Sequence, residues 1–207
     1  MEQGKYLHKK DGQLFWHLTD FSNMRSILQN GLLSRNKLIK YGLKFIDLSP
    51  NKLTKKRNNL GLDEYVPFHF FPWNPLDIAF FKENKKRNII NQEKFCYITI
   101  DRKIVDMLKA KFIVKYSNHD ENINLLEYRE CKIKIDNIGN HTDYSNGTEK
   151  LEALGECLIP DCVMYDKFYS IIVGNDKNKS DIELILQNIT KENKCIVDVR
   201  HGYFEGI

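Results

Sequence analysis

Short runs of apolar residues recur along the chain and predict strands. Most of these runs are rich in Val, Ile and aromatic residues, which favour an extended, half-buried backbone. They predict six or seven short strands, which we place at Leu14–Leu18, Val66–Phe71, Phe95–Ile100, Phe112–Val114, Glu156–Ile159, Ser170–Val173 and Cys195–Val199.

Apolar residues spaced three or four apart predict helices between these strands. Thr19 and Asp20 are good N-cap residues, and Gly31 is a natural residue to end a helix. Two polar segments lack this spacing. We predict that Lys82–Arg87 is a connector and that the basic stretch Arg35–Arg57 is a long irregular loop with short helical pieces. The predicted helices are Phe21–Asn30, one that starts at Pro75, a short one from Asp101 to Leu108, and Asp181–Ile189.

The order of these elements favours an α+β fold over a doubly wound parallel sheet, because strands and helices do not alternate regularly. The 207 residues are 42% hydrophobic and 29% charged, so we expect one domain over residues 1–207 with a sizeable core. No apolar run is long enough to span a bilayer, and the first residues lack a signal-peptide pattern. We therefore expect a soluble, cytoplasmic protein with no membrane partner.

Cysteine and histidine spacing gives no sign of a metal site. The five cysteines form no CxxC pair, and the six histidines show neither HxH nor HxxxH spacing. Neither the GxGxxG pattern of dinucleotide sites nor the P-loop pattern is present. We expect reduced, mostly buried thiols and no bound metal.

Two cationic side chains are candidates for specific roles. The net charge of +4 identifies no partner, but Arg is rare beside Lys, which makes individual arginines more informative. Arg57 ends the run Lys55-Lys56-Arg57, which is either a solvated basic loop or a site arginine flanked by phosphate contacts. His17, at the end of the first strand and before a helix, is either a part-buried strand histidine or a contact for ribose or phosphate.

A carboxylate and an aromatic patch are the other candidates. Glu156 begins an otherwise apolar strand, so it must reach solvent, find a partner or serve a site, and Gly155 before it allows close approach. The aromatic patch from Tyr65 to Trp73 is either core or a platform on which one or two rings stack a nicotinamide or a nucleobase.

These segments together resemble the DarT family of DNA ADP-ribosyltransferase toxins. The resemblance lies in Phe15–Leu28 and the turn Asn30–Asn36, in the Tyr-Val-Pro-Phe strand of Asp63–Phe70, in Asn74–Leu76, and in the glutamate strand Gly155–Ile159. It extends from about Leu14 to Val173. The sequence departs from the family pattern at His69, where Tyr is more frequent, and at Cys157, where an aromatic residue is usual.

The resemblance implies an ADP-ribosyltransferase fold: a split, mainly antiparallel sheet with flanking helices and NAD in the cleft between the halves. It implies that Glu156 and Arg57 are catalytic, that the segment 137–154 recognises the substrate, and that no metal is needed. NAD would be held by His17, Thr19, Asn23, Gly31 and Leu32, and DNA by Lys55, Lys56 and Trp73.

The resemblance also implies a function. It predicts mono-ADP-ribosylation of a base in single-stranded DNA, thymine before guanine, by a toxin whose partner is a macrodomain antitoxin of the DarG type. We expect Glu156→Ala to abolish transfer and to leave folding and NAD binding largely intact. Two alternatives stay open: a non-catalytic domain that binds single-stranded nucleic acid, and a transferase that acts on RNA or protein.

Overall fold

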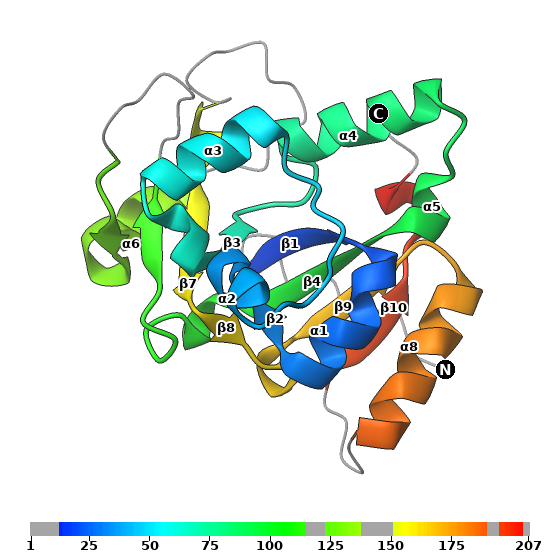
Figure 1. The fold of residues 1–207 in the computed structure, drawn as a ribbon. Coiled ribbons are helices and arrows are strands. Elements are labelled where there is room, and N and C mark those ends of the chain that lie inside the picture. The colour runs from blue at the N-terminus through cyan, green and yellow to red at the C-terminus, as the bar shows by residue number, and fades with distance from the viewer. Residues whose placement is uncertain (1–12, 115–122, 138–150, 190–194, 205–207) are drawn as a thin grey trace.

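A mainly antiparallel sheet of eight strands lies at the centre of the protein, which confirms the α+β prediction (Figure 1). The computed structural model describes residues 13–114, 123–137, 151–189 and 195–204. The strand order is β10-β9-β4-β1-β3-β7-β5-β6, and the short strands β2 and β8 form a separate pair. The strands are β1 Leu14–Asp20, β2 Leu32–Leu33, β3 Tyr65–His69, β4 Phe95–Asp101, β5 Lys111–Ile113, β6 Leu126–Glu127, β7 Glu156–Pro160, β8 Cys162–Val163, β9 Ser170–Val173 and β10 Ile196–Val199.

The helices cover this sheet on both faces. Besides the α-helices, short 3-10 turns lie at Phe21–Asn23, Leu62–Glu64, Arg102–Ile104, Tyr165–Lys167 and His201–Tyr203. The α-helices include α1 Met24–Asn30, α2 Arg35–Lys40, α3 Asn51–Asn59, α4 Pro75–Lys86, α5 Asn91–Lys94, α6 Tyr128–Asn137 and α8 Asp176–Ile189.

The large sheet is split into two halves. Strand β1 pairs with β4 along its whole length, and β3 pairs with β7 from Tyr65 opposite Pro160 to His69 opposite Glu156. Between the halves, β1 and β3 share one residue pair, Trp16 and His69. The backbones of the two halves therefore diverge beyond this point, as the resemblance predicted.

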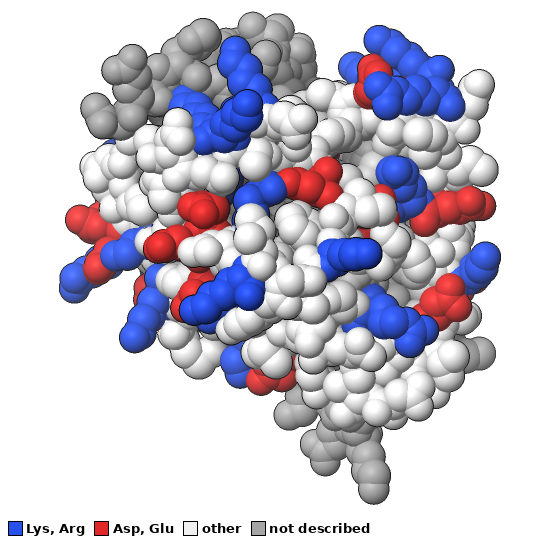
Figure 2. All heavy atoms as spheres, in the orientation of Figure 1, with Lys and Arg blue, Asp and Glu red and all other residues white. Residues whose placement is uncertain are grey.

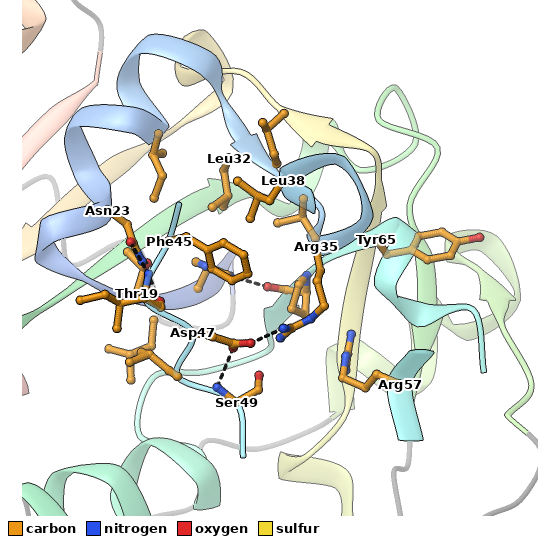
Figure 3. Close-up of a pocket in the computed structure, with 18 of the residues that line it drawn as sticks. Thr19, Asn23, Leu32, Arg35, Leu38, Phe45, Asp47, Ser49, Arg57 and Tyr65 are labelled. Carbon is orange, nitrogen blue, oxygen red and sulfur yellow. Dashed lines mark hydrogen bonds and ion pairs between the residues drawn. The ribbon is translucent and has the colours of Figure 1, made fainter. Parts of the chain in front are cut away.

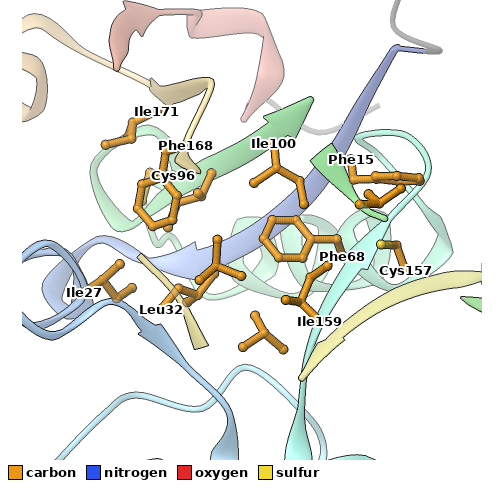
Figure 4. Close-up of a cluster of buried hydrophobic side chains, with 14 of the residues drawn as sticks. Phe15, Ile27, Leu32, Phe68, Cys96, Ile100, Cys157, Ile159, Phe168 and Ile171 are labelled. Atoms are coloured by element: carbon orange, nitrogen blue, oxygen red, sulfur yellow. The ribbon is translucent and has the colours of Figure 1, made fainter. Parts of the chain in front are cut away.

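Alternation along β1 sends neighbouring side chains to opposite faces of the sheet. Phe15 enters the main core with residues of α1 and α8, which lie side by side on that face (Figures 1 and 4). Trp16 enters a second cluster with Phe81 of α4 and with Phe204. A third cluster, around Leu158 of β7, packs against α3. These layers fix the relative positions of β1, β3, β7, α3 and α4, which build the site.

Arg102 ties the two halves of the sheet together. It is buried, and its guanidinium donates to the backbone carbonyls of Leu14, at the start of β1, and of Phe70, just after β3. It also lies 4.8 Å from the centre of the Phe15 ring, within cation–π range. Burial lowers the pKa of Arg102 to about 10, so it stays charged at neutral pH.

The basic stretch 35–57 is more regular than the sequence predicts. It holds α2 and α3, and only residues 41–50 between them are irregular. Ser34 caps α2 through a hydrogen bond to the Lys37 amide, and Pro50 precedes α3. The basic residues obscured these helices because a polar helix face has no hydrophobic periodicity to reveal it.

The prediction of a polar connector at Lys82–Arg87 is wrong, because α4 continues to Lys86. Asn74 caps this helix by accepting hydrogen bonds from the Leu76 and Asp77 amides. Its last turns are polar because one face is exposed, where Glu83 and Arg87 form an i,i+4 ion pair of 2.8 Å.

Three further predictions need correction. The helix from Asp101 to Leu108 is only a 3-10 turn over Arg102–Ile104, although Asp101 caps it as expected. The strand at Val66–Phe71 ends at His69, because its partner β7 begins opposite that residue. The described residues also contain ten strands rather than six or seven, since two-residue strands leave no sequence pattern. The five cysteines are all free, as predicted.

No helix in the described ranges is both long and apolar enough to cross a membrane.

Candidate active site

A pocket opens where β1 and β3 diverge, with a cavity volume of about 180 Å³ (Figure 3). Its walls come from β1, α1, the turn into β2, residues 44–50, α3, β3 and the first turns of α4. Six of the residues that the sequence analysis singled out meet in this lining, although they come from distant parts of the chain: His17, Thr19, Asn23, Gly31, Leu32 and Arg57.

Glu156 is not among the residues that line this pocket, but it contacts Arg57, which is. The Arg57 Nη1 donates to both carboxylate oxygens of Glu156, each at 2.7 Å. Both residues are buried, with exposed fractions of 6% for Arg57 and 4% for Glu156. The arginine and the glutamate therefore form a desolvated ion pair, which joins residues 99 positions apart in the sequence.

Helical geometry explains why Arg57 points inward while its lysine neighbours do not. Residues three or four apart share a face of a helix. Leu53 and Arg57 of α3 line the pocket on the inner face, and Leu60 follows them into the hydrophobic cluster beneath. Lys52 and Lys55 are exposed on the outer face. The same helix thus presents one cation to the site and others to solvent.

Gly155 sets the position of Glu156 at the start of β7. A Cβ atom at residue 155 would lie 2.5 Å from the Phe70 ring and 2.8 Å from the carbonyl oxygens of Ile113 and Val114. Any larger residue would push β7 away from these neighbours. The close approach expected from the Gly-Glu sequence is therefore present.

His17 is held as a neutral side chain. Its Nδ1 lies 2.7 Å from the carbonyl oxygen of Pro67, which can only accept, so Nδ1 carries the proton. The pKa of His17 is lowered to about 4, chiefly by burial, while the bond to Pro67 opposes the shift and the nearby His69 adds to it. This leaves Nε2 as a hydrogen-bond acceptor on a pocket-lining ring.

Asn23 fastens the segment 41–50 over the pocket. Its amide nitrogen donates to the Ile46 carbonyl, and its amide oxygen accepts from the Ile46 N–H, both at 2.9 Å. Asn23 also donates to the Thr19 hydroxyl at 3.2 Å. Arg35 and Asp47 add an ion pair within the same wall (Figure 3). The segment 41–50 is thus attached to the start of α1 by the Asn23 side chain and to α2 by the Arg35–Asp47 ion pair.

The turn at Gly31 closes the wall between α1 and β2. Its φ of 85° lies in a region that side chains disfavour. A Cβ there would also lie 2.5 Å from the Cys162 Sγ. Glycine lets the chain pass close to β8, which brings Leu32 into the pocket lining.

The three predicted DNA contacts lie outside the pocket lining. Lys55 and Lys56 are on α3, where Figure 2 shows Lys and Arg side chains gathered on the surface. Trp73 packs against Tyr203, with ring centres 4.7 Å apart, and its Nε1 donates to the Tyr203 carbonyl. The segment 137–154 lies mostly outside the described residues, so its role stays a prediction.

The titratable pocket residues that were not predicted as site residues include His69 and Asp77. His69 lines the cavity, and its Nδ1 lies 3.3 Å from the Gly155 carbonyl oxygen. Asp77 is buried in the first turn of α4 and accepts a 2.7 Å hydrogen bond from the Tyr97 hydroxyl. Burial raises the pKa of Asp77, and His69 and Tyr97 lower it. The alternation of polar and apolar positions in the aromatic strand could have identified His69.

No group of three or more His, Cys, Asp and Glu side chains in the described ranges is arranged to hold a metal ion.

The family model for DarT, described as a single-stranded DNA thymidine ADP-ribosyltransferase, matches residues 16–204. The chain belongs to the DarT family. As a member it is an ADP-ribosyltransferase, in agreement with the sequence resemblance. No curated protein matches the chain.

Solved DarT structures share this fold. The DarT of Thermus sp. 2.9 in complex with ADP-ribosylated single-stranded DNA superposes with a TM-score of 0.76 at 17% identity, over 94% of this chain and 97% of that one. The same protein in complex with NAD+ superposes with a TM-score of 0.70 at 18% identity, over 93% of this chain and 98% of that one. Thermosipho africanus DarTG in complex with ADP-ribose gives 0.70 at 17% identity, over 93% of this chain and 51% of that one.

Proposed function

We propose that this DarT-family chain uses NAD to attach one ADP-ribose to a base in single-stranded DNA, thymine first and guanine second. The observation that carries the proposal is the buried Arg57–Glu156 pair, whose arginine lines a pocket between the sheet halves. The NAD+ and ADP-ribosylated DNA complexes of Thermus DarT, which share the fold, support it. We take residues 1–207 as one transferase domain.

NAD is proposed to bind in the pocket, against His17, Thr19, Asn23 and the turn Gly31-Leu32. The neutral Nε2 of His17 and the Thr19 hydroxyl offer polar contacts suited to ribose hydroxyls. The cavity of about 180 Å³ is smaller than typical small-molecule sites of about 300–1,000 Å³. We therefore infer that the segment 41–50 moves outward when the dinucleotide enters. No metal is needed for this chemistry.

Glu156 is proposed to stabilise the transition state. Breaking the bond between nicotinamide and ribose builds positive charge on the sugar, as in glycosidases. A carboxylate that accepts a hydrogen bond from the 2′-hydroxyl stabilises this charge and orients the ring. Glu156 is already desolvated, so its charge acts in a medium where electrostatic interactions are strong.

Arg57 is proposed to serve both Glu156 and the acceptor base. In this structure its guanidinium holds the carboxylate in one orientation. Because it keeps its positive charge, it can also stabilise the anionic base that develops as a ring nitrogen loses its proton.

The outer face of α3 is proposed to follow the DNA backbone. Lys55 and Lys56 lie on the helix that carries Arg57 into the pocket, so phosphates bound by these lysines lie close to the site. A base in a duplex is stacked and out of reach, whereas a single strand presents it freely. Trp73 is proposed to contact the DNA by stacking on a base.

The biological role is proposed to be that of a toxin. Modified template bases block base pairing, and a cell needs a way to reverse or prevent the damage. DarTG of Thermosipho africanus shares the fold over about half of its length. The proposed partner of this chain is accordingly a macrodomain antitoxin of the DarG type.

The test is an acceptor panel. The purified chain is incubated with NAD and with single-stranded DNA, duplex DNA, RNA and a protein extract, and each acceptor is weighed by mass spectrometry. We expect a gain of one ADP-ribose on thymine-containing single strands. Salt-dependent DNA binding with no mass gain would favour the non-catalytic alternative, and gain only on RNA or protein would redirect the substrate assignment.

A further inference from the structure

Removing a proton from the acceptor base requires a proton acceptor in the pocket. The ring N3 of thymine carries a hydrogen, so its lone pair becomes available for attack only as that proton leaves. The titratable side chains that line the pocket are His17, Arg35, Lys44, Asp47, Arg57, Tyr65, His69 and Asp77, and Glu156 contacts Arg57. The Lys and Arg side chains offer only hydrogen-bond donors, so they are unsuited to receive a proton.

Most of these groups are committed elsewhere. Arg57 is a cation and Glu156 is its ion-pair partner. Asp47 pairs with Arg35, and the Tyr65 hydroxyl points away from the cavity (Figure 3). Each of them has a partner or an orientation that keeps it from receiving the proton.

Two other groups are poorly suited. Burial lowers the pKa of His17 to about 4, which makes its imidazole a weak base. The Asp77 carboxylate accepts the hydrogen bond of the Tyr97 hydroxyl and lies buried at the start of α4. This leaves His69, which is half-buried and lines the cavity.

The position of His69 places its ring beside the reacting centre. His69 and Glu156 are directly opposite each other in the β3–β7 register. Residues opposite each other in an antiparallel pair lie on the same face, with Cβ atoms about 4.5–5.5 Å apart. A base placed next to a ribose that Glu156 contacts is thus within reach of the His69 ring.

The hydrogen bonding of His69 fixes which nitrogen is available. The Gly155 carbonyl, 3.3 Å from Nδ1, can only accept, so Nδ1 carries the proton. Nε2 then holds the lone pair. Asp77, at the start of α4, lies close enough for its charge to interact with the His69 ring.

We propose that His69 is the general base of the transfer, with Nε2 taking the N3 proton of thymine. This inference rests on the proposed function. The N3–H bond breaks and its electrons form the new bond from N3 to C1′ of the nicotinamide ribose. The bond from C1′ to nicotinamide breaks, and its electron pair leaves with neutral nicotinamide. The proton passes from His69 to solvent, which balances the reaction of NAD+ and DNA to ADP-ribosyl-DNA, nicotinamide and one proton.

Two variants test this role against a structural one. His69→Gln keeps a donor for the Gly155 carbonyl but removes the basic nitrogen, and His69→Phe removes both. His201→Phe is the matched control, because His201 is exposed and lies outside the pocket lining. For each variant, kcat, the KM for NAD and the melting temperature are measured with a thymine-containing single strand.

We expect His69→Gln to lose about 100-fold or more in kcat, the usual contribution of a general base, with little change in melting temperature. Its KM for NAD should stay within about threefold of the wild-type value. His201→Phe should match the wild type. The inference would be overturned by an unchanged kcat in His69→Gln, including the case where only the KM changes.

A more acidic acceptor provides the decisive comparison. Oligonucleotides with uracil or 5-fluorouracil at the modified position differ mainly in the acidity of N3–H. If His69 takes this proton, the deficit of His69→Gln should shrink on 5-fluorouracil, whereas an equal deficit on both bases would contradict the role. Wild-type protein that modifies no oligonucleotide would refute the proposed function itself, and activity only on bases other than thymine would overturn this inference alone.

Discussion

Removal of the Glu156 carboxylate is expected to destabilise the fold as well as stop transfer. The carboxylate and the Arg57 guanidinium are both more than nine-tenths buried, and their hydrogen bonds measure 2.7 Å. Truncating one member of such a pair leaves an uncompensated buried charge, which costs about 3–5 kcal/mol. At about 2–4 °C per kcal/mol for a chain of this size, Glu156→Ala should lower the melting temperature by roughly 6–20 °C.

The buried ion pair revises the expectation, drawn from the sequence, that Glu156→Ala leaves folding largely intact. The sequence shows a carboxylate at the head of a strand but not that its partner is another buried charge. Loss of activity in this variant must therefore be measured at a temperature where the variant is folded.

A double-mutant cycle measures the pair directly. Urea unfolding is followed for the wild type, Glu156→Ala, Arg57→Met and the double variant. Because the double variant leaves no unpaired charge, it should be more stable than the sum of the single effects predicts, with a coupling energy of about 2 kcal/mol or more. The coupling should change little with added salt, since buried pairs are weakly screened. A loss below about 1 kcal/mol for Glu156→Ala, with additive effects, would refute the ion pair.

Three further predictions concern the surroundings of this pair. Folding lowers the pKa of His17 from 6.5 to about 4, so between these pH values the unfolded chain binds a proton that the folded chain does not. His17 should therefore lower the free energy of unfolding by up to about 3 kcal/mol as the pH falls from 7 to 4. The unfolding free energy of His17→Asn should lack this part of the pH dependence, and an unchanged pH profile would contradict the prediction. Asn23→Ala removes both hydrogen bonds to Ile46, so the KM for NAD should change by about 2–10-fold. An unchanged KM in enzyme kinetics would show that the segment 41–50 does not need these bonds. Gly155→Ala should cost about 1–3 kcal/mol by overpacking, whereas Gly202→Ala, with open space around it, should be neutral; equal melting temperatures for the two would disprove the close contact at Gly155.

Several elements could be predicted from local sequence because local physics determines them. The cap at Asp20 and the turn at Gly31 follow from side-chain hydrogen bonding and backbone freedom, and both are present. The glutamate strand at β7 follows from an apolar run after a small residue. Glu156 stood out as a charged group at the head of an apolar strand, which needs a reason to be there. Arg57 stood out as a rare arginine that ends a basic run, and His17 as a histidine at the end of a strand before a helix.

Other features depend on the tertiary structure and could not be predicted. The basic helix α3 has little hydrophobic periodicity, because its inner face carries an arginine whose partner lies on β7. The polar end of α4 resembles a loop until the packing of Phe81 and Asn84 shows which face is inside. Asn23 was predicted to hold NAD, but its contacts with Ile46 depend on the path of the segment 41–50, which no local rule determines.

The most direct test of the account is the mass of a single-stranded oligonucleotide with one thymine after incubation with NAD. Wild-type protein and Glu156→Gln are compared at a temperature where both are folded, as shown by circular dichroism. The account predicts a gain of one ADP-ribose for the wild type and a rate at least about 100-fold lower for the variant, since Glu156 stabilises the charge that develops on the ribose. No gain on any single strand with the wild type, or equal rates for the two proteins, would contradict it.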